Sequence, residues 1–396
     1  MKLHPWYWRS SEFMDHSLNP KVYVLTFTAF VMLSSEFIVA GLLPQIASAL
    51  QITIGHAGWL VTAFAMGMGV SAPIIAAFTY KVSLRSLLIV ACVALFLGNT
   101  LCAVTDNFTL LLIGRALGGV GVAMFWTNAV LAAAAMSTPE TRSLAVSRVL
   151  IGVSIASVVG VPLGKAVSDA WRWEDALVLM SVLSALALVM VVKCIQIPQA
   201  DEVQLHLTLA DRIRAVCRKD ILLALLSYLL IFGGIMAVFS YLATFLIRYT
   251  EFPAAYVTPV LVLYGVADIV GNLVVAKRVP EQMEGMFKRL LLILAISLMA
   301  ISLFGTTVWI LPFVIAAVGA CHAAAGLMTG IDVLRRSGAN AQLVGAFNVC
   351  AINLGIMLGA ISGGLLIDHV GLGLIGCLGG GFVLLALLIR TRLTPG

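Results

Sequence analysis

Charged residues are scarce in this sequence. Asp, Glu, Lys and Arg make up 11% of its 396 residues, whereas soluble domains carry roughly 25%. Hydrophobic residues make up 61%, and the mean hydropathy is +1.08. So few charges cannot cover a water-facing surface. The composition therefore excludes a soluble domain and indicates an integral membrane protein.

Paired or clustered cysteines are also missing. The seven cysteines show no Cys-x-x-Cys spacing and no evident pairing: Cys92, Cys102, Cys194, Cys217, Cys321, Cys350 and Cys377. Disulfide frameworks and zinc sites need such spacings. We interpret these cysteines as small apolar residues inside helices, and we expect neither a metal nor a cofactor.

Motifs of enzymes and ATPases are absent as well. The six histidines are dispersed, and there is no His-Glu-x-x-His. The stretch GVPLGKA (160–166) lacks the spacing and the Ser or Thr of a phosphate-binding Walker A loop. A membrane-embedded hydrolase or acyltransferase would need a clustered nucleophile and base, or metal ligands. We therefore predict a protein that is not an enzyme, and any pumping must be secondary. A passive channel stays open as an alternative.

The N-terminal stretch MKLHPWYWRSSEFMDHSLNPK (1–21) has no apolar core, so we do not expect a cleaved signal peptide. Two interpretations stay open. Met14 is the native start and residues 1–13 precede it, or residues 1–21 form a cytoplasmic tail with aromatic residues at the membrane interface.

Twelve apolar segments are long enough to cross a bilayer, which takes about 20 residues per helix. The expected spans are 22–43, 57–79, 86–105, 108–131, 143–166, 175–194, 221–247, 256–276, 290–305, 308–329, 341–363 and 371–389. We predict an all-α membrane protein with an N-terminal tail (1–21) and two pseudo-symmetric six-helix bundles (22–194 and 221–396). A cytoplasmic linker (195–220) joins the bundles.

Basic residues set the orientation, because Lys and Arg are enriched in cytoplasmic loops. With both termini inside, 20 of the 24 Lys and Arg residues fall on the cytoplasmic side. Lys165, Arg172 and Arg248 fall outside, and Arg115 lies within a helix. The net charge of +6 is therefore a topology signal, and we expect no nucleic-acid partner.

The two halves share a short repeat. GVPLGKAVSD (160–169) and GAISGGLLID (359–368) have Gly, Gly and Asp at matching places, 199 residues apart. Both come late in the fifth helix of their half. With the division into six and six helices, this repeat favours duplicated halves with a binding site between them.

Ionisable residues in the middle of a span mark function by default. There are four: Glu36, Arg115, Asp268 and His322. The third, sixth, ninth and twelfth spans have none in their middles. We expect these four spans to face lipid and the other spans to line a cavity.

Glu36 and Arg115 are expected at the same depth. Each lies about seven residues from the outer end of its helix, roughly 10 Å deep at 1.5 Å per residue. We therefore expect an ion pair between them, since a lone buried charge is costly. Two roles stay open for Glu36: it carries the coupling proton, with Arg115 tuning it, or the pair only holds two helices together.

The remaining candidates have weaker support. Asp268 is assigned to proton coupling, with protonated packing as the alternative. His322 is assigned to substrate binding, with a hydrogen-bonded core histidine as the alternative. Trp126, Asn128 and Tyr241 are further substrate candidates, although aromatic residues in membranes commonly serve packing alone.

Two glycine-rich stretches resemble motifs of the major facilitator superfamily. In LLIGRALGGVGVAMFW (111–126), Arg115 matches the arginine of the superfamily's fourth helix, which is linked to proton transfer. GVSIASVVGVPLGKAV (152–167) resembles the fifth-helix antiporter motif. Its glycines and proline (Gly152, Gly160, Pro162 and Gly164) are expected to shape conformational change, with Pro162 one place later than the pattern.

A more specific resemblance lies in the first two spans. SSEFIVAGLLPQIASAL (34–50), followed by AGWLVTAFAMGMGVSAP (57–73), is similar to a bacterial subgroup of twelve-helix drug:proton antiporters. This subgroup includes sugar or arabinose efflux proteins and chloramphenicol-type exporters. The superfamily's loop after the second helix is poorly matched by AAFTYKVSLR (76–85), which lacks the acid and both glycines. The inner gate that this loop usually makes is therefore in doubt.

These features predict a proton-coupled exporter of a small organic compound, drug-like or sugar-like, which works by alternating access in the bacterial inner membrane. Its expected partners are protons, the small-molecule substrate and the lipid bilayer, and we expect a monomer. For a sugar, hydrogen bonds would come from side chains such as Asn99, Asn128, Asn272, Asn348 and Asn353. A proton-coupled importer of a metabolite is the alternative.

Overall fold

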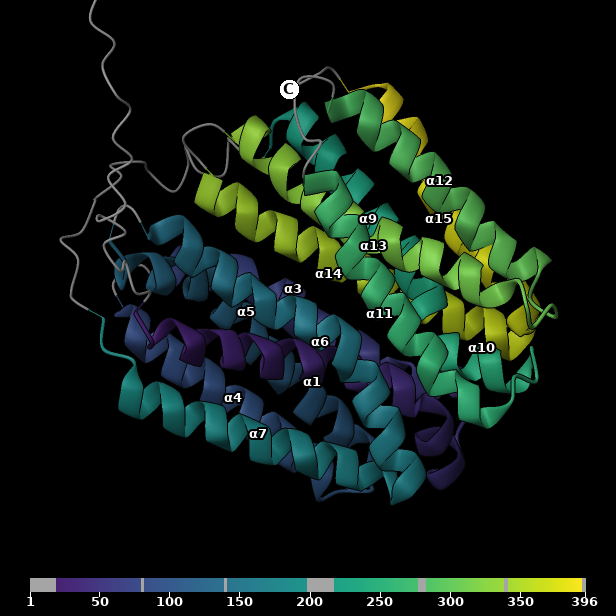
Figure 1. The fold of residues 1–396 in the computed structure, drawn as a ribbon, viewed down its shortest axis with the longest axis horizontal. Coiled ribbons are helices and arrows are strands. Elements are labelled where there is room, and N and C mark those ends of the chain that lie inside the picture. Colours follow the sequence, from purple (N-terminus) through teal and green to yellow (C-terminus); the bar gives the residue numbers. More distant parts are fainter. Residues whose placement is uncertain are drawn as a thin grey trace, which may run out of the picture.

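The computed structural model describes residues 19–79, 82–138, 141–197, 217–276, 283–337 and 341–393, and within these ranges it contains helices and no strand (Figure 1). The helices are α1 (Val22–Ala49), α2 (Ile54–Ala57), α3 (Trp59–Phe78), α4 (Leu84–Ala103), α5 (Phe108–Ala135), α6 (Arg142–Ala170), α7 (Trp173–Cys194), α9 (Lys219–Phe239), α10 (Leu242–Arg248), α11 (Ala254–Ala276), α12 (Met283–Leu303), α13 (Leu311–Ser337), α14 (Ala341–His369) and α15 (Ile375–Thr391). A 3₁₀ turn, η2 (Leu372–Leu374), precedes α15.

Twelve helices in the described ranges are long and apolar enough to cross a membrane, which confirms the predicted fold class. The short helices α2 and α10 complete the second and seventh spans. Most of the tail and of the linker (residues 1–18 and 198–216), and the basic pair Lys277 and Arg278, lie outside the described residues. The predicted domain limits therefore stay predictions.

Several predicted helix limits were wrong by six or more residues, and two of them affect the charged residues. The first span was expected to stop before Pro44, but α1 runs through this proline to Ala49. Glu36 thus lies 13 residues from the end of α1, roughly 20 Å deep and not 10 Å. The tenth span was expected to stop at residue 329, but α13 continues to Ser337 and carries Asp332 and Arg336 into the protein.

The first six spans pack together, and so do the last six (Figure 1). In the first half, α1 packs on α6, and α5 packs on α3 and α4. In the second half, α9 packs on α14 and α15, and α11 packs on α13. The two halves meet mainly along α3 with α14 and α6 with α11. Any passage between the halves is therefore bordered by these four helices and by α1 and α9.

The helices whose middles carry no charge lie at the outer edges of the protein. In Figure 1, α4 and α7 run along one edge, and α12 and α15 run along the other. We call the face where α1 begins and α15 ends the termini face. The other face, which holds residues 50–58 and 369–374, is the opposite face.

The backbone itself repeats between the halves. Gln51 and Glu251, with φ angles of 54° and 53°, are the two non-glycine residues of the described ranges that have positive φ. Each lies three residues before the helix that opens the second span of its half, at Ile54 and at Ala254. Such a φ is uncommon outside glycine, so its recurrence at matching places supports duplicated halves.

Glycines let α1 and α6 approach closely. A Cβ added at Gly152 would lie 2.2 Å from the carbonyl oxygen of Thr26, and one at Gly164 would lie 2.2 Å from the Ile38 side chain. Gly160 faces the backbone of Ser34. Pro162 lies inside α6, which is continuous from Arg142 to Ala170. The predicted motif thus packs against the segment of α1 that carries Glu36.

We expect Gly152→Ala to lower the Tm of the purified protein, because the new methyl group meets backbone that must shift. Overpacking of this kind costs about 1–3 kcal/mol. Gly381→Ala on α15 is the matched control, since no atom lies within 4 Å of its added Cβ. Equal Tm values for the two variants in the same detergent would contradict the close packing of α1 on α6.

Candidate functional site

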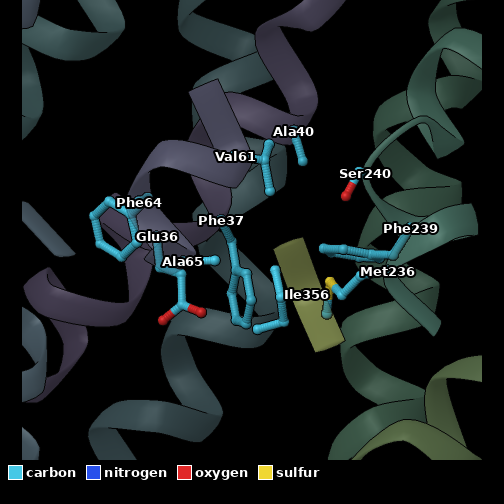
Figure 2. Close-up of a pocket in the computed structure, with 10 residues that line it drawn as sticks. All are labelled: Glu36, Phe37, Ala40, Val61, Phe64, Ala65, Met236, Phe239, Ser240 and Ile356. Atoms are coloured by element: carbon cyan, nitrogen blue, oxygen red, sulfur yellow. The ribbon is translucent and has the colours of Figure 1, made fainter. Parts of the chain in front are cut away.

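A cavity lies between the two halves, near the middle of the protein. It is small, with about 10 Å³ available to the centre of a water molecule, which is room for about one water. It is lined by residues of α1, α3, α9, the α9–α10 junction and α14 (Figure 2). The lining residues are Glu36, Phe37, Ala40, Val61, Phe64, Ala65, Met236, Phe239, Ser240 and Ile356. Eight of these ten have apolar side chains, so the cavity offers few polar groups.

Glu36 contributes the one charged side chain of this lining. It is half-buried, and its carboxylate lies beside the Phe37 ring (Figure 2). Within the described part of the chain, no hydrogen bond or ion pair reaches this carboxylate. The neighbouring Ser35 is held separately, because its hydroxyl donates to Asn99 at 2.8 Å. Glu36 is therefore a positioned carboxylate that is free to bind a proton or a ligand.

Arg115 binds the backbone that carries Glu36. Its guanidinium donates to the carbonyl oxygens of Ser35 at 2.7 Å, Glu36 at 3.1 Å and Leu60 at 3.4 Å. It also lies over the Phe64 ring, 4.2 Å from the centroid. The expected direct ion pair is not formed, because backbone carbonyls satisfy the guanidinium and leave the carboxylate facing the cavity.

Asp268 and His322 were predicted separately, and the structure brings them together. His322 Nδ1 on α13 lies 3.0 Å from Asp268 Oδ1 on α11. The two atoms are not aligned for a hydrogen bond. Three aromatic rings surround the imidazole: Phe232, Phe239 and Tyr264.

Phe239 joins this pair to the cavity. Its ring lines the cavity and packs edge-on against Phe37, with 5.8 Å between centroids. Its centroid also lies 6.4 Å from that of the His322 ring. The Phe239 ring is thus near both the cavity that Glu36 lines and the imidazole of His322.

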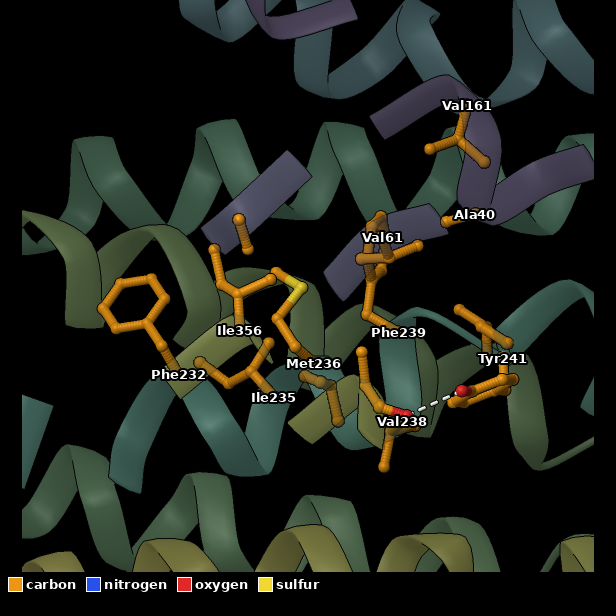
Figure 3. Packing of buried hydrophobic residues seen from close by; sticks show 14 of the residues in the cluster. Ala40, Val61, Val161, Phe232, Ile235, Met236, Val238, Phe239, Tyr241 and Ile356 are labelled. Carbon is orange, nitrogen blue, oxygen red and sulfur yellow. Dashed lines mark hydrogen bonds between the residues drawn. The ribbon is translucent and has the colours of Figure 1, made fainter. Parts of the chain in front are cut away.

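The other predicted substrate residues lie outside the cavity lining. Asn128 donates to Met124 O on its own helix, at 2.8 Å, and Trp126 packs edge-on against Phe125. Tyr241 is fully buried, and its hydroxyl donates to Ala360 O at 2.6 Å (Figure 3). Their assigned role in substrate binding stays a prediction without support from this geometry. Asn99 is likewise occupied, since it bonds Ser35 and Ser184.

A buried charge cluster was missed by the sequence analysis. Arg390 is fully buried, 2.6 Å from Glu284 and 2.9 Å from Asp332. Arg336 lies 2.8 Å from Asp332, and Tyr228 donates to the same carboxylate at 2.7 Å. The expectation that Asp268 is the one deep acid of the second half was therefore wrong. The spacing of Asp332 and Arg336, four residues apart, was the available signal.

The sequence profile of the Major Facilitator Superfamily matches residues 25–351. The chain belongs to this superfamily. It is therefore a transporter and not an enzyme, as predicted.

Relatives of this chain include named transporters. It is 26% identical over 383 residues to the inner membrane transport protein YdhP of Escherichia coli (strain K12), covering 96% of this chain and 97% of the relative. It is 25% identical over 364 residues to a probable sugar efflux transporter of Mannheimia succiniciproducens, covering 91% and 90%. These relatives match the predicted superfamily and its sugar-efflux subgroup.

Solved structures share the fold. The human organic anion transporter MFSD10 has a TM-score of 0.68 at 15% identity, covering 94% of this chain and 100% of that protein. The E. coli fucose:proton symporter FucP has a TM-score of 0.64 at 16% identity, covering 95% and 98%. At this identity the likeness concerns the fold alone.

A double-mutant cycle tests how Arg115 is held. Arg115→Lys keeps the positive charge but cannot reach three carbonyls, so we expect a loss of about 1.5–3 kcal/mol in the free energy of unfolding. Because the charge is kept, the cycle with Glu36→Gln isolates any direct bond between the side chains. We expect the two effects to add within about 0.5 kcal/mol. A coupling energy above about 1.5 kcal/mol would show that the two side chains do form an ion pair and would contradict this account.

Proposed function

We propose that this transporter exports a small, mostly apolar organic compound in exchange for protons. The observation that carries the proposal is the Glu36 carboxylate, which faces an apolar cavity between the two halves and has no partner among the described residues. An ionised carboxylate in such surroundings is costly. A proton, or a positively charged or hydrogen-bond-donating group of a substrate, relieves that cost.

Competition for one carboxylate couples the two fluxes. When Glu36 is ionised and the two halves have moved apart, the substrate binds in the widened cavity and contributes the missing positive charge or hydrogen bonds. When a proton enters from the opposite face, it neutralises Glu36 and the substrate leaves. The protonated, empty cavity then opens to the termini face, which we place in the cytoplasm on the distribution of basic residues. Each cycle thus exchanges substrate for at least one proton.

Asp268 with His322 is the candidate for a second proton site. The pair lies in the second half, behind the Phe239 ring, whereas Glu36 lies in the first half. A proton bound by Asp268 or by His322 changes the charge next to the cavity without contact to the substrate. One or two protons per cycle follow, depending on whether this pair titrates.

The lining chemistry favours an apolar compound over a sugar. A sugar carries several hydroxyl groups, and each buried hydroxyl needs a hydrogen-bond partner. The cavity provides the Glu36 carboxylate and the Ser240 hydroxyl, which is buried without a partner in the described structure. Phe37, Phe64 and Phe239 instead offer aromatic surface. We therefore propose a substrate with one or two polar groups on an aromatic or aliphatic body.

Sugar efflux is the second candidate, because relatives carry that name. These names also favour export over import, in agreement with the fifth-helix motif. Location in the inner membrane is proposed from the relative named as an inner membrane transport protein.

Transport into proteoliposomes with an imposed pH gradient tests the proposal. With phenicols, sugars and nucleosides as probes, we expect gradient-driven accumulation of an apolar compound. Glu36→Gln should lower it at least tenfold, because the side chain can no longer exchange a proton. Asp268→Asn should retain transport if its pair adds a second proton. Wild-type accumulation in Glu36→Gln between pH 6 and 8 would show that Glu36 is structural, and flux independent of the gradient would contradict antiport.

A further inference from the structure

The two halves are joined by a tight seam at the opposite face. Gly55 of α2 lies against α14, where a Cβ added to it would be 2.6 Å from the Gly364 carbonyl oxygen. A Cβ added at Gly58 would lie 2.0 Å from the Tyr241 hydroxyl. Glycine at both places lets the first half approach the second this closely. Tyr241 therefore belongs to the contact between halves and not to the cavity lining.

Asp368 forms hydrogen bonds across the edge of this contact between the halves. Its Oδ2 accepts a hydrogen bond from the Thr53 hydroxyl at 2.8 Å, and its Oδ1 accepts one from the Gly55 N–H at 3.3 Å. Both donors belong to the first half, whereas Asp368 lies near the end of α14 in the second half. The Thr53 hydroxyl also accepts from the His56 N–H at 3.0 Å, which fixes its direction.

The matching aspartate of the other half makes no such contact. Asp169 is paired with Lys165 and accepts from Gln45 at 3.4 Å, all within the first half. The partner position differs too. Counted from the repeated positive-φ residues Gln51 and Glu251, Thr53 corresponds to Pro253, which has neither a hydroxyl nor an N–H. Of the two repeated aspartates, Asp368 forms hydrogen bonds to the other half in the described structure and Asp169 does not.

Two glycines nearer the termini face, Gly330 on α13 and Gly345 on α14, show no such close approach. Among the described residues, no atom lies within 4 Å of a Cβ added at either position.

We propose that Asp368 is a gating residue: its bonds to Thr53 and Gly55 hold the opposite face closed, and they must break before the cavity opens there. The inference rests on the proposed transport function only in assuming that the cavity opens to both faces in turn. Asp368 acts on the equilibrium between the two states and does not touch the substrate.

Distances between spin labels test this role without any substrate. The labels are placed at Val104→Cys and Leu303→Cys, exposed positions at the opposite-face ends of α4 and α12. The accessible native cysteines Cys194, Cys217, Cys350 and Cys377 are replaced by serine. In lipid nanodiscs, we expect one main, short distance for the parent protein. Thr53→Val should raise the ratio of the longer to the shorter distance about two- to tenfold, as expected for one lost hydrogen bond.

Matched variants separate gating from general damage. Thr53→Ser keeps the hydroxyl and should restore the parent distribution. Asp368→Asn should behave like Thr53→Val, and Asp169→Asn should leave the distribution unchanged. Distributions for Thr53→Val and Asp368→Asn that equal the parent's, in samples with the parent's Tm, would overturn the proposal. Failure of proton coupling at Glu36 would leave these distances unaffected, so the two proposals fail separately.

Discussion

The binding of Arg115 to the backbone of α1 is the interaction on which the site depends. A buried guanidinium is stable only when its donors are satisfied, and here three carbonyl oxygens and the Phe64 ring satisfy it. Because the guanidinium of Arg115 binds backbone carbonyls, the Glu36 carboxylate has no partner in the part of the chain that the structure describes. The glycines of α6 pack against the same stretch of α1. A fixed backbone with a free carboxylate is what a proton carrier requires.

The two halves have similar backbones but different chemistry. The first half supplies Glu36 and Arg115, and the second supplies Asp268 and His322 behind the Phe239 ring. The second half also holds a buried cluster of Glu284, Asp332, Arg336 and Arg390 near the termini face. Duplication thus accounts for the similar architecture of the halves. Differences at matching positions, such as Thr53 in the first half and Pro253 in the second, give the halves different contacts.

The sequence predicted the twelve spans and the superfamily because both depend on local features. Hydropathy marks each span, and the motifs around Glu36, Arg115 and Pro162 are contiguous. It also identified Glu36, Arg115, Asp268 and His322 as buried, since charged residues in apolar runs are conspicuous. It did not predict that Asp268 meets His322, because this contact joins α11 to α13 and depends on how the helices rotate.

The failures have physical causes of the same kind. Side-chain charge suggested a Glu36–Arg115 ion pair, but backbone carbonyls compete for a guanidinium and leave no trace in the sequence. Pro44 suggested a helix end, although α1 accommodates it. Asp332 and Arg336 were placed in a loop because α13 is longer than its apolar run. The contact of Asp368 with Thr53 spans 315 residues, so no local pattern could reveal it.

The central claim is that substrate and proton compete for Glu36. It is tested most directly by adding a transported compound to the purified protein in weakly buffered detergent solution near neutral pH and recording proton release with a pH indicator. The account predicts proton release in the wild type, at most about one proton per bound substrate, and none in Glu36→Gln. Equal release from the two proteins at matched occupancy would contradict it.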